Sequence, residues 1–86
     1  TLIGFGKPLL AQNESESNGF SYSLKLYNQQ FYDLAAQQFI KYYSNYPSSA
    51  RVDLAHYYAA MSSFQLRNYK KARMEFQTLA VSYPKS

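Results

Sequence analysis

The 86-residue sequence contains no cysteine and no tryptophan, a single histidine, and only three glycines and three prolines. Without cysteine, these residues cannot form a disulfide, ligate a metal through thiolates, use a thiol nucleophile or carry a lipid on cysteine. The glycines and prolines fall within residues 1–19 or at Pro47 and Pro84, so they leave the segments between uninterrupted. No alternating apolar pattern indicates a strand. The absences together favour a helical domain.

Chemistry-bearing residues are also scarce. Five acidic against nine basic residues give a net charge of +4, without a nucleic-acid-binding motif, so we expect no nucleic-acid partner. His56 and the preceding Asp53 supply at most two metal ligands, which favours packing or solvation as the role of His56. No serine has a histidine and an acid at a recognisable spacing, and no glycine loop suits a phosphate. We therefore predict that the chain is not an enzyme and holds no cofactor or metal.

Two segments of the chain repeat one another at an interval of 37 residues, for example 69 − 32. The matched residues are Tyr32, Ala35, Phe39, Tyr46, Pro47 and Ser49 in the first copy, and Tyr69, Ala72, Phe76, Tyr83, Pro84 and Ser86 in the second. A period in this range indicates an array of helical repeats. Such arrays hold other molecules and rarely carry out chemistry, so the repeat predicts a binding function.

The spacing of apolar residues predicts four helices in two antiparallel hairpins, an all-α fold. Phe20, Leu24 and Tyr27 recur at three- and four-residue intervals, which places them on one helical face. The helix expected after Pro47 is apolar nearly all round, which is typical of a helix sandwiched between neighbours. The expected segments are an N-terminal arm with a polar linker at 1–19, a first hairpin at 20–49 and a second hairpin at 50–86.

One motif in the repeat resembles a known family. Ala-x-x-x-Phe, followed eight residues later by Pro, occurs at Ala35, Phe39 and Pro47, and again at Ala72, Phe76 and Pro84. This motif resembles the second half of the tetratricopeptide signature, although the tryptophan and glycine of that family are missing. The resemblance covers residues 20–86. It implies two hairpins stacked as a fragment of a right-handed solenoid, with further repeats beyond the C-terminus.

The resemblance also implies where a partner binds, because tetratricopeptide arrays bind peptides on the inner face of the first helix of each hairpin. The corresponding positions here are Phe20, Leu24, Tyr27 and Asn28 in the first copy, and Tyr57, Met61, Phe64 and Gln65 in the second. Aromatic and methionine side chains with an interspersed amide suit a peptide groove. The alternative is that some of them pack against an adjacent helix or against residues 1–12.

The densest charge cluster offers a different binding surface. It consists of Arg67, Lys70, Lys71 and Arg73. One interpretation is a solvated turn and outer helix face; the other is a basic patch that contacts an acidic polymer, the cell wall or a membrane surface. Lys70 and Lys71 fall in the first turn of an expected helix, where positive charge opposes the helix dipole, and this local cost favours the second interpretation.

Residues 1–12 bear on the location of the protein. This apolar stretch is too short to span a bilayer, which takes about 20 residues. It resembles the second half of a secretory signal peptide with Ala11 at the cleavage position, and the alternative is a loosely packed arm. The Tyr-Pro-x-Ser repeat ends resemble those of two groups of bacterial envelope proteins, the outer-membrane β-barrel assembly lipoprotein and the periplasmic Tol–Pal coordinator. We therefore expect a periplasmic or outer-membrane-associated scaffold that binds a protein or peptide.

Overall fold

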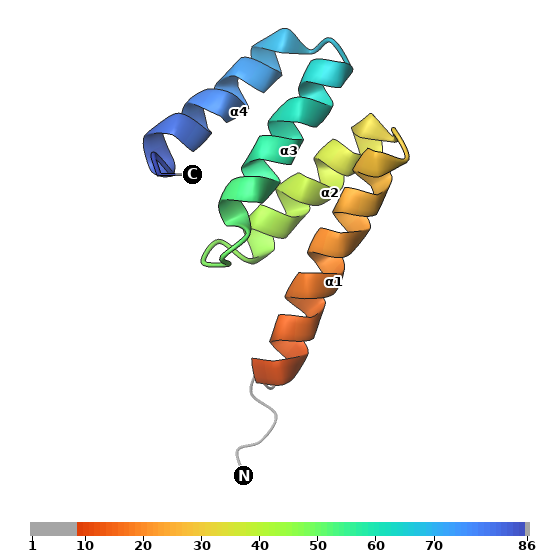
Figure 1. The fold of residues 1–86 in the computed structure, drawn as a ribbon, viewed down its shortest axis with the longest axis vertical. Coiled ribbons are helices and arrows are strands. Elements are labelled where there is room, and N and C mark those ends of the chain that lie inside the picture. Colours follow the sequence, from red (N-terminus) through yellow and green to blue (C-terminus); the bar gives the residue numbers. More distant parts are fainter. Residues whose placement is uncertain (1–8, 86) are drawn as a thin grey trace.

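A computed structural model describes the backbone of residues 9–85 and the side chains of residues 13–85. The described chain forms the helices α1 (Leu9–Asn28), α2 (Tyr32–Asn45), α3 (Val52–Gln65) and α4 (Tyr69–Ser82). Each helix packs against the next one along the chain, so two helix hairpins lie side by side (Figure 1). The all-α expectation is confirmed, and residues 9–85 contain no strand.

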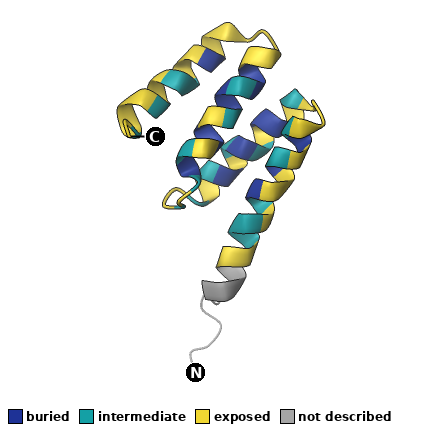
Figure 2. Cartoon of the chain, viewed as in Figure 1, coloured by how far each residue is buried: buried dark blue, intermediate teal, exposed yellow. Residues whose placement is uncertain are grey.

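The core lies between the two hairpins, on α2 and α3. Figure 2 shows that buried positions gather on these two helices and on the part of α1 that faces them, whereas most of α4 is exposed. Ala35 and Phe39 of α2 and Ala55 and Ala59 of α3 are almost completely buried. The helix that is apolar nearly all round therefore has neighbours on both sides, as its composition predicts.

Aromatic rings fill the space between the hairpins. The Phe39 ring stacks on Tyr58 of α3 with 5.4 Å between centroids, and it meets Phe20 of α1 edge to face at 5.8 Å. Ala35 lies one helical turn before Phe39, and its small side chain lets the neighbouring helices approach closely. The Ala-x-x-x-Phe motif of the first copy is thus a packing motif: the alanine permits contact and the phenylalanine fills it.

The repeat in sequence is also a repeat in backbone conformation. Gln30 and Arg67 occupy equivalent turns and both adopt a left-handed backbone, with φ of 68° and 63°. In the first turn, the Phe31 amide donates to the Leu26 carbonyl at 2.9 Å, and the same bond with the same length occurs 37 residues later. This bond over five residues is the Schellman motif, in which a left-handed residue ends a helix. Both hairpins therefore turn by the same local geometry.

The ends of α2 and α4 repeat as well. Tyr46 and Tyr83 follow these helices with φ and ψ of −129° and 60°, and −134° and 61°. Each donates its backbone amide back into the helix, to Tyr42 and Leu79 respectively. Each is followed by a proline, which disfavours helical geometry in the residue before it. The expected ends of both second helices agree with the structure to within one residue.

The expected polar linker is wrong, because residues 13–19 lie inside α1. The polar side chains of this segment find partners in the rest of the protein. Glu16 accepts hydrogen bonds from α2 and from the α2–α3 connection, and Gly19 packs against the Tyr42 ring. The Ser23 hydroxyl donates to the Gly19 carbonyl at 2.8 Å. The first eight residues of the expected N-terminal arm lie outside the described residues.

Candidate functional site

An apolar groove of about 500 Å³ lies along α4 and the end of α3. We call it the terminal groove, and its lining residues are Phe64, Tyr69, Ala72, Arg73, Phe76, Gln77 and Ala80. The rings of Phe64 and Tyr69 meet edge to face at 5.4 Å, yet they are 48% and 56% exposed. Neighbouring exposed rings of this kind mark a surface that another molecule covers.

Each residue of the terminal groove has a counterpart 37 positions earlier. The counterparts, in the same order, are Tyr27, Tyr32, Ala35, Ala36, Phe39, Ile40 and Tyr43. In the first hairpin, α3 covers this surface. Its Tyr58 ring lies 5.0 Å from Tyr27 and 5.4 Å from Phe39. The surface that seats a helix on the first hairpin is therefore open on the second.

A smaller hollow of about 320 Å³ continues the groove. It is lined by Asp53, Leu54, Tyr57 and Leu79, and we call it the side hollow. The Tyr57 ring lies 6.3 Å from Phe76 of the terminal groove. The counterparts of its lining residues are Glu16, Ser17, Phe20 and Tyr42. In the first hairpin, Arg51 occupies this position, with its guanidinium 5.6 Å from the centre of the Phe20 ring.

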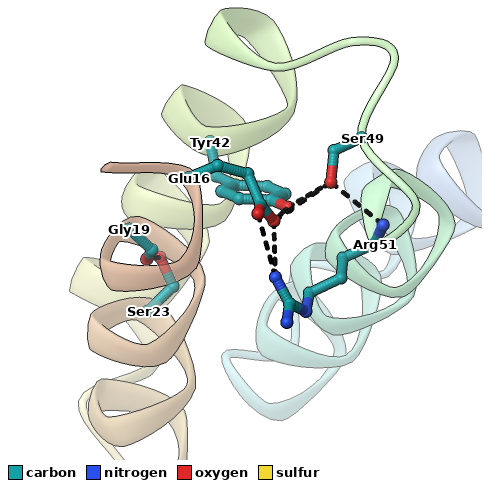
Figure 3. Close-up of polar contacts among 6 residues, drawn as sticks. All are labelled: Glu16, Gly19, Ser23, Tyr42, Ser49 and Arg51. Carbon is teal, nitrogen blue, oxygen red and sulfur yellow. Dashed lines mark hydrogen bonds and ion pairs between the residues drawn. The ribbon is translucent and has the colours of Figure 1, made fainter. Parts of the chain in front are cut away.

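Glu16 fixes Arg51 and ties α1 to the connection between α2 and α3 (Figure 3). Arg51 Nη1 donates to both carboxylate oxygens, at 3.0 and 2.7 Å, and the Tyr42 hydroxyl and the Ser49 hydroxyl donate to Oε2. Burial raises the pKa of Glu16, but these hydrogen bonds and the Arg51 charge outweigh it and lower the pKa below its ordinary value. Our sequence analysis missed this cluster. Glu16 and Asp53 differ by one repeat, so extending the alignment upstream would have indicated it.

A second polar cluster joins α2, α3 and α4. The buried His56 places Nδ1 3.0 Å from Glu75 Oε1, and the Tyr43 hydroxyl donates to Glu75 Oε2 at 2.7 Å. Burial, followed by the hydrogen bond and charge of Glu75, raises the pKa of Tyr43 above its ordinary value, so its hydroxyl stays a donor. Within residues 13–85, no three histidine, aspartate or glutamate side chains are placed to hold a metal. The cluster links three helices through residues far apart in sequence.

The residues predicted to bind a peptide fall into different environments. Phe64 lines the terminal groove and Tyr57 the side hollow. Tyr27, Leu24 and Met61 are half-buried, while Asn28 and Gln65 are exposed at the ends of α1 and α3. Phe20 was expected on the inner face and is instead in the core, 9% exposed against the Phe39 and Tyr42 rings. It lies inward because it is the residue under which α1 and α2 pack.

The predicted basic patch is exposed at all four positions, Arg67, Lys70, Lys71 and Arg73. Two of its members line different hollows. Arg73 lines the terminal groove, whereas Lys71 lines a hollow of about 240 Å³ with Tyr43 and His56. The charges are therefore spread around α4, and only Arg73 contributes to the terminal groove.

No protein-family model, curated protein or solved structure matches this chain. The tetratricopeptide resemblance therefore rests on the residues of this chain alone. In the part of the chain that the structure describes, none of the helices combines the length and apolar character that crossing a membrane takes. The argument about function consequently starts from the terminal groove and its occupied counterpart.

Proposed function

We propose that this chain is a helical-repeat binding module that receives a helix of a partner protein in the terminal groove. The observation that carries the proposal is the register of the repeat: seven residues line the groove, and the same seven positions in the first copy form the surface under α3. The protein thus contains an example of what such a surface holds. Docking an apolar helix face into a groove is a recurrent mode of protein recognition.

The exposed rings give the energetic reason for binding. Phe64, Tyr69 and Tyr57 are each at least 40% exposed at this end of the molecule. Covering apolar surface favours association by about 25 cal/mol per Å², and aromatic anchors in a groove dominate the energy of many interfaces. The partner helix supplies the cover that α3 supplies to the first hairpin.

The finer assignment follows from the sequence resemblance. We assign the repeats to the tetratricopeptide type and the protein to a bacterial cell-envelope assembly, on the motifs shared by its repeat ends. The predicted peptide-binding residues Phe64 and Tyr57 belong to the proposed binding surface. The alternative, a basic patch for an acidic polymer, cell wall or membrane surface, has less support because Lys71 and Arg73 line different hollows.

A selection experiment tests the proposal. Phage-displayed helical peptides are selected against the chain, and their affinities are compared for Ala80→Glu and Val81→Glu. Both residues are exposed on α4, so both variants should fold, but only Ala80 lines the groove. We expect Ala80→Glu to abolish binding and Val81→Glu to preserve it. Binding that ignores Ala80→Glu, or that falls steeply with added salt as exposed ion pairs do, contradicts the proposal.

A further inference from the structure

The comparison of the two copies also defines the occupant, if the proposed function is taken as its basis. We infer that the terminal groove selects a partner-protein helix with three features of stated register. A central aromatic ring stands where α3 has Tyr58, between small residues such as Ala55 and Ala59. A second, larger ring replaces His56. A cation stands where the chain has Arg51.

The central ring follows from the faces that receive it. Tyr58 stacks on Phe39 with an interplanar angle of 17°, and it meets Tyr27 edge to face. The counterparts of these two residues are Phe76 and Phe64, both aromatic, so the terminal groove keeps a face and an edge for one ring. In α3, the residues at 55 and 59 are alanines with at most 1% exposure, which lets the helix approach closely. The occupant needs the same small neighbours.

The second ring follows from a side chain that the second copy lacks. In the first hairpin, Tyr43 stacks on His56 with 3.7 Å between ring centroids. The counterpart of Tyr43 is Ala80, so the space of one ring is open at this point of the terminal groove. Tightly packed interfaces conserve total volume. A helix with tryptophan at the position of His56 fills that space better than α3 itself would.

The cation follows from the side hollow. Arg51 precedes Tyr58 by seven residues (58 − 51), and it lies between the Glu16 carboxylate and the Phe20 ring. The counterparts in the side hollow are Asp53 and Tyr57, again a carboxylate and a ring. Arginine or lysine suits both groups, through a charge-assisted hydrogen bond and a cation–π contact. The occupant therefore carries its positive charge seven residues before the central ring.

A second copy of this chain fits the terminal groove poorly. The positions of α1 equivalent to Ala55 and Tyr58 of α3 are Asn18 and Ser21, both exposed and polar, so α1 does not present the required face. α3 itself is already covered on both sides. A two-fold dimer through the groove would bring the Arg73 side chains of both copies into one interface, where like charges repel. A different protein is the occupant that the surface favours.

The test uses synthetic peptides with the sequence of residues 50–66, held helical by a staple through positions 53 and 57. Those two positions face α4 in the protein, away from the surface that α3 presents to the first hairpin. Dissociation constants for the 86-residue chain are measured by calorimetry for the parent peptide and for its Tyr58→Ala and His56→Trp forms. We expect Tyr58→Ala to weaken binding at least about tenfold and His56→Trp to tighten it about fivefold, as for buried aromatic anchors.

A protein variant completes the cycle. Ala80→Tyr restores the ring that the first copy has at Tyr43, so the preference should reverse, with the His56 peptide bound more tightly than the His56→Trp peptide. An unchanged preference, or equal binding of the Tyr58→Ala peptide, overturns the inference. If none of the peptides binds while phage-selected helices bind in an Ala80-sensitive way, the inference is wrong and the proposed function stands. A dimer in sedimentation experiments that Ala80→Glu dissociates would name a second copy as the occupant and overturn it.

Discussion

Replacing Glu16 with alanine removes the acceptor that Tyr42, Ser49 and Arg51 share, and should loosen α1 from the rest of the protein. Hydrogen bonds to a charged group contribute about 1.5–3 kcal/mol, and the Glu16 side chain is only 18% exposed. Arg51 is 43% exposed, so its ion pair adds no more than about 1 kcal/mol. Tyr42 keeps a partner, because its hydroxyl lies 2.6 Å from the Ser49 hydroxyl. We therefore expect a loss of about 2–3 kcal/mol in the free energy of unfolding.

The same carboxylate predicts a pH dependence. The hydrogen bonds of the folded state lower the pKa of Glu16 relative to the unfolded chain. A group with a lowered pKa stabilises the fold fully above its unfolded pKa, and this stability is lost as the pH falls through the folded pKa. The free energy of unfolding of the native protein should therefore fall with acidification. In Glu16→Gln that part of the fall should be absent.

Urea denaturation followed by circular dichroism measures both effects. Glu14→Ala is the matched control, because Glu14 is an exposed acid on the same helix. If Glu16→Ala and Glu14→Ala differ by less than about 0.5 kcal/mol, the difference is no larger than that of ordinary surface substitutions, and the cluster does not hold α1. An acid response that is identical in the native protein and Glu16→Gln would refute the pH argument separately.

Three further substitutions test the packing and the turns by the same urea assay. Phe39→Ala should cost about 3–5 kcal/mol, because Phe39 is completely buried between the hairpins, and a cost below about 1 kcal/mol would deny it that place. The buried Ser62 hydroxyl finds no hydrogen-bond partner within residues 13–85, so Ser62→Ala should stabilise the fold by about 1 kcal/mol, and destabilisation would reveal a missed partner. Gln30→Gly relieves a left-handed backbone and should stabilise by about 0.5–1 kcal/mol, whereas Gln29→Gly should not; equal effects would show that the left-handed turn carries no strain.

The helices and turns were predictable because they depend on neighbouring residues. Pro47 and Pro84 end α2 and α4 through local backbone geometry, and the spacing of Phe39 and Ala35 marks the face that packs. The internal repeat strengthens each such inference, since both copies must satisfy the same local rules. These signals predicted an all-α fold of two hairpins without knowledge of any tertiary contact.

The polar clusters were not predictable in this way. Residues 13–19 have the composition of a linker, and only contacts with Tyr42 and Arg51, far along the chain, make this segment helical. His56 meets Glu75 across two helices, while the nearer Asp53 had been considered as its partner. Composition describes what a segment does alone in water. It does not describe how side chains from distant helices satisfy one another.

The terminal groove has both origins. Its residues could be aligned with the first copy from the sequence, but their exposure depends on what packs next to α4, which only the structure describes. The predicted binding residues came from the family resemblance and included Phe64 and Tyr57. The alignment alone did not indicate that Phe76 and Ala80, on α4, form most of the surface with Tyr69.

The most direct measurement of the central claim is a set of intermolecular NMR contacts between the chain and a bound helical peptide carrying the tryptophan substitution. The account predicts that the central ring of the peptide contacts Phe76 and Phe64, and that the tryptophan contacts Ala80, in the register that α3 has on the first hairpin. Contacts confined to α1, or to the Lys70 and Lys71 side chains, would contradict it.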